Sequence, residues 1–375
     1  MILCFDVPRD AKDALDRLMA TAAYRDVSEA VAAALISYES ITKAGLAGAV
    51  PTIPRQAEAP SGAPSAAGTP STQAGLEPTA AVSLFALSQS KSDDRNGPAV
   101  SAVPFEDVPP TGWLFGQYNK LLPLKASCRA MLNLLHEYRE GVPLREAANR
   151  IADAASLLGE RLRQMDRASE RQREDAFAAA FPSAGPADVG SRIRFANQFV
   201  GDFRQSPRSS NSIQPPRFNS MPGALKLAVC TGAKSPVVEL TAPGREFASL
   251  PNPALDKSGP PIGGKLSGEE IAFLVGHISA AVPEEASAIY SVLQGVTQGA
   301  DTPAGIDEFI CSKYELTVTD VPQNQKEITR TFLTTQRTGA ISRMIDLALL
   351  TRIKSGLYVR YTVSDSGKAL LKQFS

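Results

Sequence analysis

A long stretch of small and turn-forming residues divides this chain. Residues 46–110 are dominated by Ala, Pro, Ser, Gly and Thr, as in "PRQAEAPSGAPSAAGTPSTQAGLEPTAAV", and carry few large side chains. Such a segment cannot bury enough apolar area to offset its ordering entropy, so the sequence predicts a disordered linker. The residues before it and after it are therefore expected to fold as separate units.

Composition narrows the class of protein. The chain carries 39 basic and 39 acidic residues, so its overall charge argues neither for nor against a nucleic-acid partner. Cys4, Cys128, Cys230 and Cys311 are scattered without a CxxC pair, which predicts reduced cytosolic thiols. No run approaches the roughly eighteen apolar residues of a membrane span. We expect a cytoplasmic, nucleoid-associated protein without membrane contact.

The segment before the linker reads as one strand followed by two helices. Apolar side chains alternate in "LCFDVP", and helical stripes follow in "RDAKDALDRLMATAAY" and "RDVSEAVAAALISYE". This order resembles the ribbon-helix-helix family, whose members pair their strands across a dimer and insert the ribbon into the DNA major groove. The resemblance covers residues 1–41 and implies, for a module over residues 1–45, a homodimer. Its expected contact residues are Leu3, Phe5, Val7, Leu15, Leu18, Val31 and Leu35.

The strand of this module departs from the family in the side chains that would face DNA. These positions hold Ile2, Cys4 and Asp6, and none of them can donate to guanine as Arg or Lys does. Acidic residues also outnumber basic ones in residues 1–45, which disfavours phosphate binding. The module is therefore expected to hold the dimer, and contact of its ribbon with DNA stays open.

After the linker the chain becomes helical. The segment "PLREAANRIADAASLLGERLRQMDRASERQRED" predicts a long amphipathic helix with Pro143 near its start. Its stripe is expected either to pack within the chain or to pair with its copy in a dimer.

A strand running into a capped helix occurs twice. In "YVRYTVSDSGKALLKQF", Ser364 is expected to cap the helix, and Gly367, three residues later, lets the first turn pack closely. In "VVELTAPGREFASLPNP", Thr241 and Gly244 repeat this spacing, and Pro243 is tolerated in the first turn. The sequence therefore contains an internal repeat.

The residues before each capped helix extend the repeat. Both "GAISRMIDLALLTRIKSGLYV" and "PGALKLAVCTGAKSPVVEL" predict a helix end, a strand and a turn. In the second copy, one face of the strand is expected to be buried, and it is formed by Leu357, Val359, Tyr361 and Val363. Helix, strand, turn, strand and capped helix resemble the winged-helix family of prokaryotic regulators. We expect a mainly α fold with small β-wings, in which winged-helix domains span residues 111–255 and 256–375.

The second copy carries a local excess of positive charge. Basic residues clearly outnumber acidic ones from residue 321 onward, as phosphate binding requires. The first copy has a Pro- and Ser-rich insertion, "RQSPRSSNSIQPPRFNSMP", where its recognition helix is expected. In the family, the recognition helix lies in the major groove and the wing touches the neighbouring backbone. The resemblance assigns base or phosphate contacts to Gln336, Arg337, Thr338, Ser342 and Arg343, and wing contacts to Arg352, Lys354 and Arg360.

Signals of catalysis are weak. "GPPIGGKL" matches the GxxxxGK spacing of a phosphate loop, but Leu266 stands where the hydroxyl residue should be, and Ser267 and Glu270 match a capping box instead. His136 and His277 are isolated in helical apolar stretches. We therefore expect neither an enzyme nor a metal or other cofactor.

These observations favour a non-enzymatic, dimeric transcription regulator that binds double-stranded DNA through its C-terminal winged helix. The alternative is an adaptor or scaffold subunit of a multiprotein DNA-processing or defence assembly. In that case the basic face would be a solvated surface on a domain that contacts other proteins.

Overall fold

The computed structural model describes residues 83–87, 97–138, 140–169, 176–185, 188–201, 220–232, 235–256, 264–324 and 326–374. The module predicted for residues 1–45, with its expected dimer contacts, lies outside them. Of the predicted linker, only residues 83–87 and 97–110 are described.

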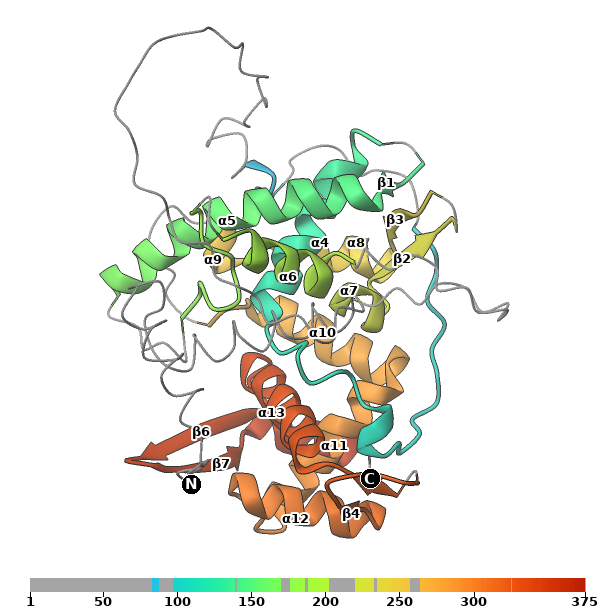
Figure 1. The fold of residues 1–375 in the computed structure, drawn as a ribbon, viewed down its shortest axis with the longest axis vertical. Coiled ribbons are helices and arrows are strands. Elements are labelled where there is room, and N and C mark those ends of the chain that lie inside the picture. Colours follow the sequence, from blue (N-terminus) through green and yellow to red (C-terminus); the bar gives the residue numbers. More distant parts are fainter. Residues whose placement is uncertain are drawn as a thin grey trace, which may run out of the picture. The chain divides into compact units, whose positions relative to one another are not determined.

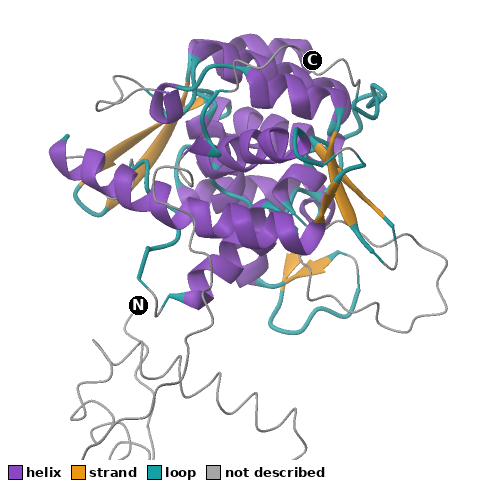
Figure 2. Cartoon of the chain, turned by 90° about the horizontal axis from the view of Figure 1, so that it is seen from above, coloured by secondary structure: helices purple, strands orange, loops and turns teal. Residues whose placement is uncertain are grey.

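Helices dominate the described chain and strands form only short pieces, as the sequence predicted (Figure 1; Figure 2). The first part contains η1 (Pro110–Gly112), α4 (Leu121–Leu135), β1 (Val142–Pro143), α5 (Leu144–Ala168), α6 (Val189–Phe199), α7 (Met221–Ala224), β2 (Ala228–Thr231), β3 (Val237–Leu240), α8 (Ala242–Ser249) and α9 (Pro253–Asp256). The second contains α10 (Gly268–Ala281), α11 (Pro283–Thr297), α12 (Pro303–Tyr314), β4 (Thr317–Val318), β5 (Glu327–Ile328), α13 (Arg330–Asp346), β6 (Leu350–Ser355), β7 (Tyr358–Val363) and α14 (Asp365–Phe374).

The first part is built around a small antiparallel sheet with the strand order β1-β3-β2. The central strand β3 places Val238 opposite both Val142 and Cys230. Helix α4 packs against α8 and α5. The predicted apolar stripe of α5 is buried inside this unit, so it is not exposed for pairing with a second copy. Its buried members are Ala147, Ile151, Ala154, Leu158, Leu162 and Met165.

The hairpin β2–β3 leads into a helix capped as the sequence predicted. Thr241 Oγ accepts a hydrogen bond from Gly244 N at 3.1 Å and donates to Lys226 O at 2.8 Å. The backbone N of Thr241 donates to Leu227 O. A Cβ atom on Gly244 would overlap that same carbonyl of Leu227, so the close approach requires glycine. The cap therefore ties the start of α8 to the start of the hairpin.

The hairpin β6–β7 repeats this pattern bond for bond. Ser364 Oγ accepts from Gly367 N at 3.0 Å and donates to Ala348 O at 2.7 Å, while Ser364 N donates to Leu349 O. A Cβ atom on Gly367 would overlap the carbonyl of Leu349. The residues before the two strands, Lys226 and Ala348, both adopt φ of 55°. The repeat predicted from the cap spacing is thus confirmed at the level of hydrogen bonds.

Residues 97–110 belong to the folded unit, although the sequence assigned them to the linker. The ring of Phe105 lies 4.9 Å from that of Phe374 and 5.6 Å from that of Tyr290. The backbone N of Val103 donates to Ala280 O at 2.8 Å. The average composition of the linker concealed these few large side chains, which are enough to anchor an extended segment.

Candidate nucleic-acid interface

Helix α13 is where the sequence placed the base-reading residues. Thr329 caps its start by accepting a hydrogen bond from Phe332 N, and the left-handed Ala348 follows its last turn. The helix packs against α11, α12 and β6. Residues 116–121, which lead into α4, also contact it. α13 is therefore an inner helix of the second part.

Both polar atoms of the Gln336 side chain are hydrogen-bonded inside the fold. Its Oε1 accepts from Gly116 N at 2.5 Å, and its Nε2 donates to Pro110 O at 3.1 Å. Only 3% of the residue is exposed. A bidentate contact of this amide to adenine would first require the segment that carries Gly116 to leave.

Arg343 forms a buried ion pair. Its Nε and Nη2 atoms lie 2.7 and 2.6 Å from the two carboxylate oxygens of Glu285, and Nη1 donates to Tyr118 O at 2.6 Å. The side chains are 1% and 0% exposed. Burial raises the pKa of Glu285, an effect that the charge and hydrogen bonds of Arg343 oppose. This guanidinium stabilises the fold and presents no surface to a ligand.

Two more of the predicted contacts on α13 are similarly occupied. Arg337 is mostly buried, and its Nε lies 2.9 Å from Asp307 Oδ1. Ser342 Oγ donates to Asn119 O at 2.8 Å and accepts from Lys120 Nζ at 3.2 Å.

Thr338 is the one predicted contact on α13 that is exposed. The expectation that this helix offers Gln336, Arg337, Ser342 and Arg343 to DNA therefore does not fit their placement. Their polar groups contact other parts of the same chain.

The hairpin β6–β7 differs in that all three predicted wing contacts are exposed: Arg352, Lys354 and Arg360. The two strands pair along their whole length, so residues opposite each other share a face. Arg352 lies opposite Tyr361, and Arg360 lies opposite Ile353. Arg360 Nη1 also lies 3.5 Å from Asp301 Oδ2, in a pair that stays open to solvent. Positive charge is therefore present on both faces of the hairpin, which extends beside α13 in Figure 1.

The end of this hairpin also exposes apolar side chains. Leu357 is 99% exposed, Tyr358 81% and Ile353 50%. The sequence had placed Leu357 on the buried face with Tyr361, and that is wrong because Leu357 lies in the turn between the strands. The Ser-Gly pair before Leu357 was the signal for a turn at this point. Cations and apolar groups together suit contact with phosphates and with groove walls or base edges.

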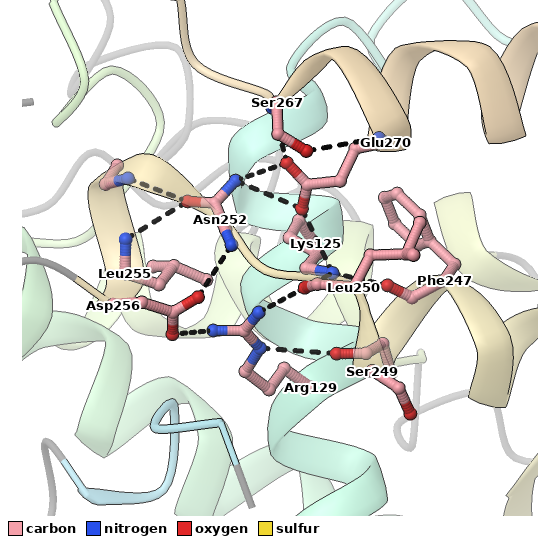
Figure 3. Close-up of polar contacts among 12 residues, drawn as sticks. Lys125, Arg129, Phe247, Ser249, Leu250, Asn252, Leu255, Asp256, Ser267 and Glu270 are labelled. Carbon is pink, nitrogen blue, oxygen red and sulfur yellow. Dashed lines mark hydrogen bonds and ion pairs between the residues drawn. The ribbon is translucent and has the colours of Figure 1, made fainter. Parts of the chain in front are cut away.

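A buried polar cluster lies between the first and second parts, where Lys125 and Glu270 form an ion pair of 3.0 Å with no exposure (Figure 3). Lys125 Nζ also donates to Leu250 O at 2.7 Å and to Phe247 O. Burial lowers the pKa of Lys125 to about 8, against the opposing charge of Glu270. All three donors of the ammonium group are used, so none remains for a substrate.

Arg129 completes the cluster in the same manner. It donates to Ala248 O at 3.2 Å, to Leu250 O at 2.5 Å and to the carboxylate of Asp256. Asn252 in turn donates to both carboxylate oxygens of Glu270, at 3.1 and 2.8 Å. Figure 3 shows these side chains converging from α4, α9 and α10. The cluster therefore joins the two parts of the unit, and its charged groups pair with one another and with backbone carbonyl groups.

The described part of the chain contains no group of three His, Cys, Asp or Glu residues placed to hold a metal ion. None of the helices described there is long and apolar enough to cross a bilayer. Comparisons with protein-family models, with curated proteins and with solved structures found no match.

Proposed function

We propose that this protein binds duplex DNA and that the hairpin β6–β7 makes the main contact. The observation that carries the proposal is the exposed set of Arg352, Lys354 and Arg360 around an equally exposed tip at Leu357 and Tyr358. A two-stranded ribbon of this kind fits a DNA groove, and cations on both of its faces can reach phosphates.

The repeat supports the same proposal. A helix, a hairpin and a hydroxyl-capped helix occur twice, and the first copy adds a third strand in the order β1-β3-β2. This arrangement supports two winged-helix-like domains, with DNA contact through the wing of the second. A transcription regulator is the kind of protein we infer, and catalysis is no part of the proposal.

Salt dependence tests the contact directly. Three phosphate contacts predict a slope of about −2.7 for log K against log salt, or roughly a 40-fold loss of affinity between about 50 and 200 mM salt. Removing one of them, with Arg352→Ala or Lys354→Ala, should lower the slope by about 1. Lys368→Ala is the matched control, because Lys368 is an exposed basic residue on α14, outside the hairpin.

Fluorescence anisotropy of a labelled duplex, measured for each variant across the salt series, gives these slopes. Binding that ignores salt, or that weakens equally in the Lys368→Ala control, would show that the hairpin is not the DNA contact.

An adaptor function is the second candidate, and the apolar tip is the observation that favours it. Tyr is enriched among the residues that anchor protein interfaces, and Tyr358 is 81% exposed beside the still more exposed Leu357. This function requires no salt-dependent DNA binding. A chain with no affinity for duplex DNA at low salt would therefore favour the adaptor.

We also propose that residues 1–45 hold a homodimer, on the sequence resemblance alone. Sedimentation equilibrium of the full chain and of a chain starting at residue 46 tests this. A dimer in both, or a monomer in both, would contradict the assignment.

A further inference from the structure

A five-residue piece of the predicted linker lies against the first part of the unit. Residues 83–87 form a single turn in which Ala86 N donates to Ser83 O at 3.0 Å. Phe85 is only 1% exposed and ranks among the largest fully buried side chains of the described residues. Residues 88–96 connect this turn to the rest of the unit. The segment is therefore a short turn with one deeply buried aromatic side chain.

Helix α4 binds the backbone of this segment. Asn133 Nδ2 donates to Leu84 O at 2.8 Å and to Ala86 O at 3.0 Å, so both of its amide hydrogens are used. Arg129 Nη1 donates to Phe85 O at 3.4 Å. A turn leaves its last carbonyl groups without partners, and these two side chains, one helical turn apart, satisfy three of them in a row.

One of the two donors on this face is also held in place by parts of the fold other than the segment. Arg129 is held by Ala248 O, Leu250 O and Asp256, all from the α8–α9 region. A donor fixed in this way loses little freedom when a peptide carbonyl arrives, which favours binding. The segment buries the Phe85 side chain and three of its carbonyl groups accept hydrogen bonds, so these contacts favour a peptide with a Phe in a turn.

We propose that the face of α4 around Arg129 and Asn133 is a peptide-binding site and that residues 83–87 are its tethered, displaceable ligand. The ligand class is a short turn with a central Phe flanked by small or aliphatic residues, as in "SLFAL". An intramolecular ligand on a short connection has an effective concentration of about 1 mM. For an intrinsic Kd of about 100 µM, the tethered segment weakens a free peptide about tenfold.

A labelled peptide with the sequence of residues 81–89 tests the proposal against the full chain. Phe85→Ala in the protein empties the site, so this variant should bind the peptide about tenfold more tightly than the unaltered chain. Adding Asn133→Ala should weaken that binding at least fivefold. Leu87→Ala is the matched control, because Leu87 is partly exposed and its change leaves Phe85 in place.

The same anisotropy measurement defines what would overturn the proposal. Equal peptide affinity for the unaltered and the Phe85→Ala chains would do so, as would equal binding of a peptide that lacks Phe. If Phe85→Ala cannot fold by circular dichroism, Phe85→Leu, which keeps an apolar side chain, takes its place and should bind the peptide with intermediate affinity. A Phe85→Leu chain that binds the peptide no better than the unaltered chain does would end the proposal.

Discussion

Replacing Arg343 by alanine gives the sharpest test of whether α13 is a structural helix or a reading helix. Arg343 and Glu285 are almost completely buried and joined by two hydrogen bonds of 2.7 and 2.6 Å. Removing one partner leaves a buried carboxylate without its cation, which costs about 3–5 kcal/mol of folding free energy. At about 2–4 °C per kcal/mol, Tm should fall by roughly 6–20 °C.

The loss should depend on pH in a defined direction. Burial already raises the pKa of Glu285, and the variant lacks the opposing effect of Arg343. The folded variant then binds a proton more tightly than the unfolded chain does, so its stability rises as pH falls through the raised pKa. The difference in Tm between Arg343→Ala and the unaltered chain should therefore be smaller at pH 5 than at pH 8.

A double replacement separates the pair from its surroundings. Arg343→Met with Glu285→Leu removes both charges while keeping apolar volume, so much of the lost stability should return. Urea unfolding of the single and double variants gives the coupling energy between the two positions. Two results together would refute this reasoning: Arg343→Ala lowers the free energy of unfolding by less than about 1 kcal/mol, and the folded variant no longer binds DNA. Arg343 would then be a DNA contact.

Three further predictions follow from single contacts. A Cβ atom on Gly339 would overlap the carbonyl oxygen of Gly116, so Gly339→Ala should lower Tm clearly, whereas Gly276→Ala, with open space around it on α10, should leave Tm equal or slightly higher. Ser364→Ala removes the cap of α14 and should cost about 1 kcal/mol in urea unfolding, and an unchanged midpoint would deny the cap any role in stability. Burial lowers the pKa of His277, so as pH falls the unfolded chain binds a proton at this imidazole more readily than the folded chain does. The free energy of unfolding should fall from pH 7 to pH 5.5, and His277→Gln should flatten that fall.

The parts of the fold that were predicted from the sequence depend on neighbouring residues. The caps at Thr241 and Ser364, and the capping box of Ser267 and Glu270, each join atoms within three residues along the chain. Local bonds of this kind depend on residue type and spacing, which the sequence displays directly. The mainly helical class followed in the same way from the apolar stripes.

The burial of α13 could not be predicted, because distant segments cause it. Tyr118, which binds Arg343, lies 225 residues earlier in the chain, and Glu285 lies 58 residues earlier. An arginine on an amphipathic helix looks the same in sequence whether its partner is a phosphate or a buried carboxylate. The wrong prediction that Leu357 is buried has a different cause. The predicted alternating pattern starts one residue too early, since Leu357 belongs to the turn and β7 begins at Tyr358.

The two hairpins differ in how their outer strands are covered. In the first copy β3 pairs with β1 as well as with β2, whereas β6 and β7 pair only with each other among the described residues. Exposed strand edges invite pairing with other chains, and charged side chains prevent it. A second role for the basic side chains on β6 and β7 is therefore to prevent the edges of these strands from pairing with other chains.

The sign of the charge separates edge protection from DNA contact. A charge of either sign blocks edge pairing, but only a positive one attracts phosphate. Arg352→Glu with Lys354→Glu should therefore leave the size distribution by light scattering unchanged and abolish binding to a labelled duplex. If the double variant binds DNA as the unaltered chain does, the positive charge of these side chains is not needed for DNA binding, and the adaptor function becomes the better account of the hairpin.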